Sequence, residues 1–181
     1  FWMIGLTYFQ ATAAVVSISV PFISPQGIAQ GDVSQKNYVT QQDRYHTFRI
    51  PGAIVTQDGS VLVFAEGRRG MGGDPRTNGN APNDLVMRRS TDHGQTWEPL
   101  VVIDSGFLPN GDKVDYADPT PVFDAETETV FLVYGQLPDL GPDSPAYGQS
   151  PVAADAHHVV WVRASTDNGK TWSERKQIVY H

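Results

Sequence analysis

The sequence predicts an all-β protein built from antiparallel strands. Turn-forming residues are abundant, with 17 glycines and 13 prolines in 181 residues. Short runs of β-branched and aromatic residues alternate with polar turns along most of the chain. No long run of residues shows the period of about 3.6 that marks an amphipathic helix. Together these observations favour many short strands joined by turns.

The predicted strands are recognised by their β-branched and aromatic content. They cover residues 53–56, 60–64, 85–89, 120–123, 129–134 and 158–163. Asp58-Gly59 separates the first two strands, and an Asp-Gly pair between β-rich runs is a strong hairpin signal. A polar turn at residues 124–128 predicts a second hairpin in the same way.

One segment occurs twice, each time between two strands. Residues 90–97 (STDHGQTW) recur as residues 165–172 (STDNGKTW). We expect the aspartate to accept hydrogen bonds from its own loop, the glycine to adopt a positive φ, and the tryptophan to fold back as a small local core. Calcium or sugar binding by the aspartate is the alternative, but turn closure accounts for every residue type in the segment.

The N-terminal segment is uncharged up to Asp32 and mostly apolar to Ile23. This composition predicts an export signal or its remnant over residues 1–29, cleaved after Ala29 and followed by a polar lead-in at residues 30–44. An uncleaved membrane anchor and an ordinary buried segment are the alternatives, and prolines near the end of the segment weaken the anchor. We therefore expect an exported protein with no stable membrane span after processing.

The composition excludes several functional classes. With 13 Lys and Arg against 20 Asp and Glu, the net charge is −7, which argues against non-specific binding to nucleic acid. The absence of cysteine excludes disulfides, thiolate metal sites and a cysteine nucleophile. His157 and His158 are adjacent on a predicted strand and would point to opposite faces, so we predict no metal site and no cofactor.

The repeated segment resembles the Asp-box repeat of sialidases and several other β-propellers, which by itself indicates architecture rather than activity. Upstream, Phe48-Arg49-Ile50-Pro51 is similar to the Phe/Tyr-Arg-Ile-Pro motif that opens the catalytic domain of exo-sialidases (neuraminidases). Residues 45–47, just before this motif, are similar too, and so are residues 66–68, 74–89 and 116–120 after it, in the family's order.

The resemblance covers residues 45–181 and implies a six-bladed β-propeller with four-stranded antiparallel blades. At about 40–50 residues per blade, this stretch would hold about three of the six blades. We therefore expect an incomplete propeller, the N-terminal half of a sialidase domain.

The resemblance implies that Arg49 is the first of three arginines that clamp the carboxylate of sialic acid. Arginine suits this task because its planar fork donates two parallel charge-assisted hydrogen bonds to one carboxylate. The alternative for Arg49 is an ordinary surface arginine at the edge of a strand.

The resemblance also implies that Asp74 is the acid/base carboxylate. Asp74 follows Arg68 by six residues in a glycine-rich loop, and such loops often carry function. The acid must be protonated when it donates to the leaving oxygen, which partial desolvation favours. Asp84, Asp112 and Asp115 compete for the role, although Asp84 opens a predicted strand and fits a structural role better. The remaining alternative is that Asp74 is an ordinary solvated aspartate of its loop.

Arg68 and Asp118 resemble the pair that contacts the O4 hydroxyl of the sugar or its neighbourhood. An arginine beside a carboxylate offers one hydroxyl both a donor and an acceptor. An ordinary ion pair at the rim is the alternative.

The resemblance thus implies an exo-α-sialidase that hydrolyses terminal sialic acid from glycoproteins, glycolipids or oligosaccharides with retention. No segment of the chain matches those that carry the family's tyrosine nucleophile, its glutamate and the other two clamp arginines, so we expect this portion alone to be inactive. One alternative is a non-catalytic Asp-box propeller serving as a carbohydrate-binding or interaction module. It would not need Arg49, Asp74 and Arg68 together. The other is a propeller glycosidase of another substrate class, which has no use for a carboxylate clamp.

Overall fold

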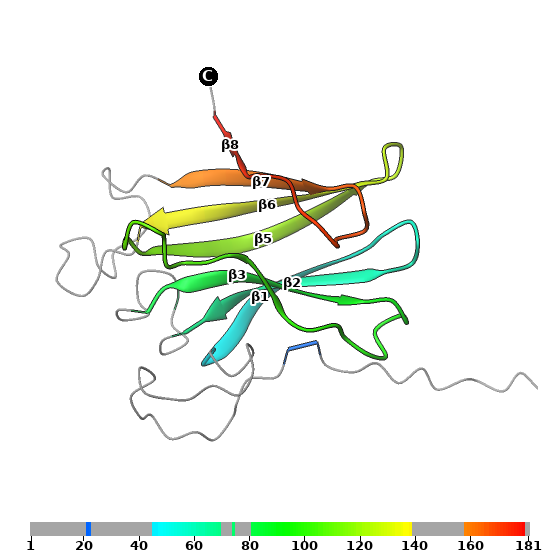
Figure 1. Ribbon diagram of the computed structural model, residues 1–181, viewed down its shortest axis with the longest axis horizontal. Helices are drawn as coiled ribbons and strands as arrows, with labels where there is room; N and C mark the ends of the chain where they lie inside the picture. Colours follow the sequence, from blue (N-terminus) through cyan, green and yellow to red (C-terminus); the bar gives the residue numbers. More distant parts are fainter. Residues whose placement is uncertain (1–20, 23–44, 70–73, 75–80, 139–157, 180–181) are drawn as a thin grey trace, which may run out of the picture.

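The computed structural model describes residues 21–22, 45–69, 74, 81–138 and 158–179. These residues form two four-stranded antiparallel sheets, in the orders β1-β2-β3-β4 and β5-β6-β7-β8 (Figure 1). The strands are β1 (Thr47–Val55), β2 (Val61–Arg68), β3 (Asn83–Ser90), β4 (Val101–Asp104), β5 (Val114–Asp124), β6 (Thr129–Pro138), β7 (Val159–Ser165) and β8 (Lys176–Ile178). All regular structure in these ranges is β, which confirms the predicted class, and they contain no helix that could cross a membrane.

Both predicted hairpins are present, and each is closed by an aspartate in its turn. In the β1–β2 turn, Asp58 accepts the hydroxyl of Thr56 at 2.7 Å, and Gly59 has a φ of +81°. In the β5–β6 turn, Asp124 accepts the hydroxyl of Thr127 at 2.6 Å. The same two aspartates also accept main-chain N–H groups, that of Ser60 at 2.9 Å and that of Glu126 at 3.0 Å, and so satisfy donors that a tight turn leaves without a main-chain partner.

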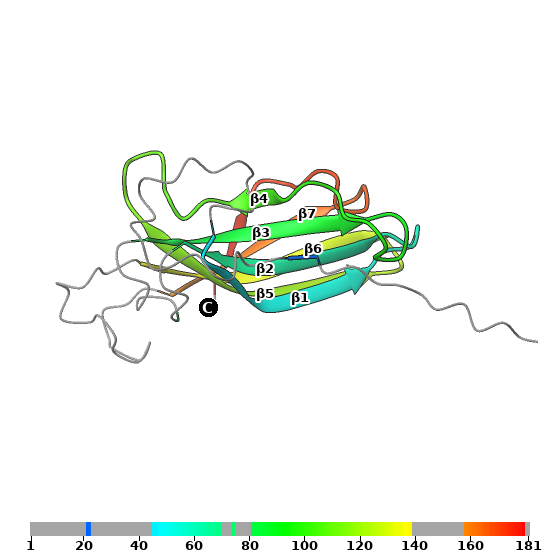
Figure 2. The same cartoon turned by 90° about the horizontal axis from the view of Figure 1, so that it is seen from below.

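The two sheets pack against each other through one shared apolar core. Its buried members are Leu62, Phe64, Leu85 and Met87 from the first sheet and Val114, Tyr116, Val130, Leu132 and Tyr134 from the second. The first strands of the two sheets, β1 and β5, lie side by side (Figure 2). A Cβ added to Gly52 would stand 2.5 Å from the main-chain oxygen of Pro119, so the close approach of these strands requires glycine. This is the arrangement of two neighbouring blades.

The described residues contain two sheets where about three were predicted. The first sheet extends over residues 47–104 and the second over residues 114–178. Each therefore uses more chain than the roughly 40–50 residues assumed per blade. The long connections after β2 and β6, which lie largely outside the described residues, account for the difference in length. The predicted export signal and lead-in, apart from residues 21–22, lie outside the described residues.

Both Asp-box segments form the turn between the third and fourth strands of their sheets. In the second copy, Asp167 accepts the N–H of Thr171 at 2.9 Å and the hydroxyl of Ser165 at 2.8 Å, while Gly169 has a φ of +81°. The first copy repeats this pattern around Asp92. The predicted self-braced turn is confirmed in both copies.

The tryptophan of the second copy does not make the local core that was predicted. Trp172 instead packs edge-on against Phe64 of β2, with ring centroids 5.7 Å apart. The prediction was wrong because the turn lies at the boundary between the two sheets, where the ring packs against the core that both sheets share.

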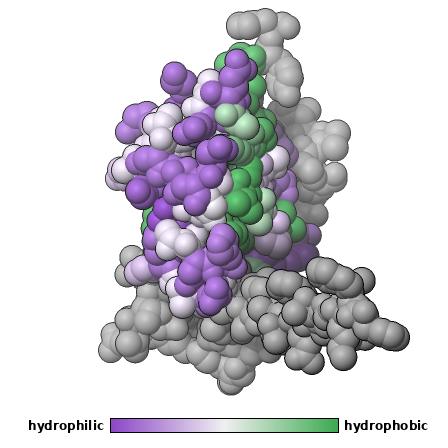
Figure 3. All heavy atoms as spheres, turned by 90° about the vertical axis from the view of Figure 1, so that its right-hand side faces the viewer, coloured by the Kyte–Doolittle hydropathy of each residue, from purple (hydrophilic) through white to green (hydrophobic). Residues whose placement is uncertain are grey.

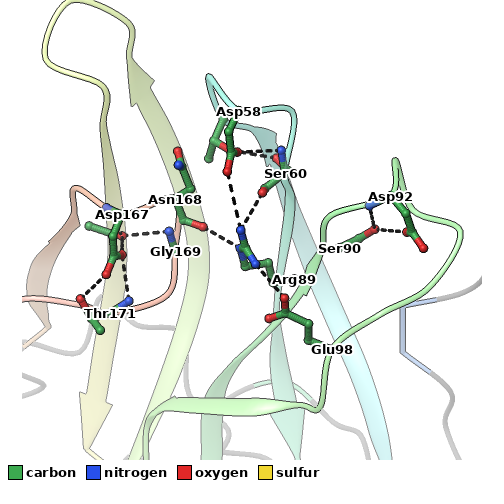
Figure 4. Close-up of polar contacts among 12 residues, drawn as sticks. Asp58, Ser60, Arg89, Ser90, Asp92, Glu98, Asp167, Asn168, Gly169 and Thr171 are labelled. Carbon is green, nitrogen blue, oxygen red and sulfur yellow. Dashed lines mark hydrogen bonds and ion pairs between the residues drawn. The ribbon is translucent and has the colours of Figure 1, made fainter.

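Arg89 of β3 ties the same Asp-box to the first sheet (Figure 4). Its Nε donates to the main-chain oxygen of Asn168 at 2.9 Å, and its Nη2 donates to the hydroxyl of Ser60 at 2.8 Å. Its Nη1 bonds Glu98 at 2.7 Å. The second Asp-box therefore serves as a docking element between the sheets as well as a turn.

Large apolar side chains remain exposed on strands of both sheets. Val55 of β1 is 57% exposed and Val122 of β5 is 49% exposed. Seen from the Asp-box end, a hydrophobic strip runs beside a hydrophilic surface (Figure 3). Such surfaces fit blades that pack against further blades, because single repeat units cannot bury both of their faces.

Candidate active site

The predicted site residues and the Asp-boxes lie at opposite ends of the sheets. In the β2–β3 pairing, Arg68 stands opposite Asn83, and Val61 stands opposite Ser90, where the first Asp-box begins. The Asp-box turns, which follow β3 and β7, lie toward the right in Figure 1. Arg49, near the start of β1, lies at the Arg68 end because β1 runs antiparallel to β2.

Three of the four predicted site residues are in direct contact. Arg49 Nη1 is 3.0 Å and Arg68 Nη1 is 3.1 Å from the same oxygen, Oδ1 of Asp74. The side chain of Asp74 is 72% exposed and that of Arg49 is 47% exposed, whereas that of Arg68 is 1% exposed. An accessible carboxylate is thus held between one surface arginine and one buried arginine. The glycines that flank Asp74 lie outside the described residues.

Glu66 was quoted with the motif but received no predicted role, and the structure places it under the site. Its Oε2 accepts both Nε and Nη2 of Arg68, at 2.9 and 2.6 Å. Burial raises the pKa of Glu66, and the hydrogen bonds and charge of Arg68 oppose that rise. The strand pattern could have identified this pair, because residues two apart on a strand point to the same face.

The fourth predicted residue, Asp118, is joined to the others through Glu66. The main-chain N–H of Asp118 donates to Oε1 of Glu66 at 3.1 Å, across the boundary between the sheets. Asp118 has a φ of +56° at an irregularity between Ala117 and Thr120 in the β5–β6 pairing. Bulges of this kind redirect side chains and are frequent beside active sites.

The first sheet has the same irregularity at the corresponding strand. The pairing of β1 with β2 shifts between Arg49 and Gly52, and Ile50 has a φ of +52°. The residues with positive φ at these two irregularities, Ile50 and Asp118, each directly precede a proline. A β-branched residue in this conformation costs about 1–3 kcal/mol, and such strain persists where the surrounding structure enforces it, often at functional sites.

The carboxylates that compete with Asp74 have other partners. Asp84 is buried and accepts the hydroxyl of Tyr45 at 2.5 Å and the N–H of Gly106 at 2.9 Å. Asp115 is also buried and accepts the N–H of Asn83 at 2.8 Å. These two aspartates hold neighbouring segments together.

Asp112 is exposed and accepts the side-chain amide of Asn110 at 2.7 Å, within the β4–β5 connection. Within the described ranges, no group of three or more His, Asp or Glu residues is placed to hold a metal ion.

The BNR/Asp-box repeat family matches residues 88–99 and 163–174, which contain the two Asp-box turns. A sialidase of Micromonospora viridifaciens is 34% identical over 139 residues, covering 76% of this chain and 20% of the relative. An exo-alpha-sialidase of Arthroderma benhamiae is 32% identical over 143 residues, covering 72% of this chain and 32% of the relative. The chain thus spans between a fifth and a third of the length of these two relatives.

Solved structures of sialidases have the same fold. The Hadza microbial sialidase Hz136 superposes with a TM-score of 0.60 at 28% identity, covering 75% of this chain and 27% of that one. The NanB sialidase of Streptococcus pneumoniae gives a TM-score of 0.57 at 11% identity, covering 91% of this chain and 39% of that one. These likenesses confirm the predicted architecture, an incomplete sialidase-like β-propeller.

Proposed function

This chain is related to the sialidases with BNR/Asp-box repeats, and from that premise we propose that the protein carrying it hydrolyses terminal sialic acid from glycoconjugates. The observation that carries the proposal is the contact of Arg49 and Arg68 with one oxygen of Asp74 at the blade end opposite the Asp-boxes. It brings a carboxylate-binding group and an accessible carboxylic acid together in a relative of sialidases.

In this proposal Arg49 binds the carboxylate of the substrate. Arg49 already binds a carboxylate, that of Asp74, through Nη1 at 3.0 Å. A sialic acid carboxylate presents the same two-oxygen acceptor, so it can replace Asp74 on the guanidinium without a change in the arginine. Phe48 and Pro51 line an apolar hollow beside Arg49. Apolar walls weaken the competition of water for such an ion pair.

Asp74 then donates a proton to the glycosidic oxygen as the bond breaks. Its exposure leaves it accessible to a substrate above the sheet end, and loops positioned by a rigid sheet commonly carry such groups. Once the substrate carboxylate holds Arg49, Asp74 is released from its ion pair with that arginine. Arg68 and Asp118 contact a ring hydroxyl, which we assign to O4 or its neighbourhood.

Retention requires a nucleophile on the opposite side of the anomeric carbon. A neutral tyrosine suits a substrate that carries its own carboxylate, because a carboxylate nucleophile would be repelled, and tyrosine nucleophiles are a known exception to the two-carboxylate scheme. We propose that the tyrosine, its glutamate and two further arginines come from the rest of the full-length protein. We also propose that the protein is exported to meet its glycoconjugate substrates, since residues 1–29 have the composition of an export signal.

The test is release of free sialic acid from α-linked sialosides by the full-length protein, with α-glycosides of neutral sugars as the control. Cleavage of the sialosides alone, giving the α-anomer as the first product by NMR, supports an exo-α-sialidase that retains configuration. Binding of sialosides without cleavage would instead indicate a carbohydrate-binding module. Cleavage of the neutral glycosides would indicate a glycosidase of another substrate class.

A further inference from the structure

We propose that Glu66 is a positioning residue that sets both Arg68 and Asp118 for recognition of the sugar hydroxyl. This inference rests on the proposed function, because it concerns the pair that we assign to that hydroxyl. Protein donors engage both oxygens of the buried Glu66, so it does not contact substrate itself. It acts through the two residues that its oxygens hold.

The first oxygen of Glu66 orients Arg68. Oε2 accepts Nε at 2.9 Å and Nη2 at 2.6 Å, which engages one edge of the guanidinium. Nη1 is the nitrogen that reaches Asp74, at 3.1 Å. Because the guanidinium is planar, fixing one edge fixes the direction in which Nη1 points.

The second oxygen of Glu66 orients Asp118. Oε1 accepts the main-chain N–H of Asp118 at 3.1 Å, at a residue whose φ is +56°. Proline follows Asp118, and residues before proline normally adopt an extended conformation. The hydrogen bond from Glu66 therefore helps to hold a strained backbone, and that backbone aims the Asp118 side chain.

A carboxylate is needed for both tasks at once. Glu66 accepts hydrogen bonds on both oxygens, from donors that come from two different sheets. A glutamine has one acceptor oxygen, and its amide nitrogen would face a donor at either Arg68 or Asp118. The substitution also removes the buried carboxylate that pairs with Arg68 at 2.6 Å, and a buried ion pair that loses one partner is strongly destabilised.

Another arginine–glutamate pair of the same sheet provides a control. Glu98 pairs with Nη1 of Arg89 at 2.7 Å, at the Asp-box end. Glu98→Gln thus removes one carboxylate from one arginine, as Glu66→Gln does, but far from the proposed site. If Glu66 served only stability, Glu66→Gln and Glu98→Gln would differ in their free energies of unfolding but not in their discrimination between substrates.

The experiment compares kcat/KM for an aryl sialoside and its 4-deoxy analogue in the full-length protein, its Glu66→Gln and Glu66→Asp variants, and the Glu98→Gln control. We expect Glu66→Gln to lose about tenfold or more in kcat/KM on the 4-hydroxy substrate, mainly through KM, and much less on the 4-deoxy substrate. The preference for the 4-hydroxyl should therefore collapse. Glu66→Asp keeps the charge and should recover part of it, and Glu98→Gln should keep all of it.

If the wild type cleaves sialosides and Glu66→Gln keeps the wild-type preference for the 4-hydroxy over the 4-deoxy substrate, this inference is overturned and the proposed function is not. If Glu66→Gln does not fold, Glu66→Asp decides, and a wild-type preference in that variant overturns the inference. Absence of sialoside cleavage by the wild type overturns the proposed function and this inference with it.

Discussion

Arg49 and Asp74, 25 residues apart in the chain, form an ion pair of 3.0 Å at the end of the first sheet. The arginine proposed to bind the substrate carboxylate therefore already holds a carboxylate of the protein. Substrate binding becomes an exchange of one carboxylate for another, and the displaced one is the proposed acid.

Arg49→Lys should weaken catalysis in the full-length protein because a point charge replaces a two-pronged donor. We expect a loss of about 2 kcal/mol or more in transition-state stabilisation, about 30-fold in kcat/KM. Arg88→Lys is the control, because Arg88 lies on the same sheet and donates to the main-chain oxygens of Trp97 and Glu98. Wild-type kinetics in Arg49→Lys would remove Arg49 from the clamp.

Asp74→Asn should slow substrates with poor leaving groups far more than substrates with activated aryl leaving groups, since only the former need a proton donor. The measurement is kcat/KM over a series of aryl sialosides of graded leaving-group pKa. Asp112→Asn, in another exposed segment, should behave as wild type. Equal losses on all leaving groups in Asp74→Asn would assign it a positioning role.

Gly169→Ala should disrupt the contact between the second Asp-box and the first sheet. Gly169 has a φ of +81°, and an added Cβ would lie 2.6 Å from Leu62. Gly111 has a φ of +90° with open space around it, so Gly111→Ala isolates the backbone strain. We expect Gly169→Ala to lose roughly 3 kcal/mol in the free energy of unfolding and Gly111→Ala to lose about 1 kcal/mol. Equal losses would mean that the two sheets do not meet at Gly169.

The Asp-box aspartates should make stability depend on acid pH. Hydrogen bonds from Thr96, then from Ser90, lower the pKa of Asp92 from 3.8 to about 2. Burial would raise the pKa of Asp167, but hydrogen bonds from Thr171 and Ser165 outweigh it and lower that pKa to about 2 as well. A carboxylate with a depressed folded-state pKa contributes stability above its unfolded pKa and loses it as the pH falls through the folded value.

The stability difference between wild type and Asp92→Asn should therefore be largest above pH 4 and shrink toward pH 2, with Asp167→Asn behaving alike. Denaturant unfolding across this pH range measures it. A difference that stays constant down to pH 2 would mean that the hydrogen bonds do not favour the ionised form.

Features set by neighbouring residues could be predicted from the sequence. The Asp58-Gly59 hairpin and the two Asp-box turns follow local rules for aspartate and glycine, and the structure has them where predicted. The register of β2 also explains why Arg68 lies at the end away from the Asp-boxes. The roles of Arg49, Arg68, Asp74 and Asp118 in catalysis remain predictions that only kinetics can test.

Features that depend on contacts between the sheets could not be predicted. Trp172 reaches Phe64 and Glu66 reaches Asp118 across the boundary between two sheets, and no spacing in the chain encodes those contacts. The positive φ of Asp118 opposes the local preference before proline, so tertiary structure imposes it.

The most direct test of the central claim, a carboxylate clamp for sialic acid, is inhibition of the full-length protein by a sialic-acid transition-state analogue and by its carboxyl methyl ester. The ester removes the negative charge and leaves the rest of the molecule intact. We predict that the acid inhibits at least tenfold more strongly than the ester, and that Arg49→Lys narrows this gap, because the gap measures a charge-assisted pair. Equal inhibition by acid and ester, or no inhibition by either, would contradict the claim.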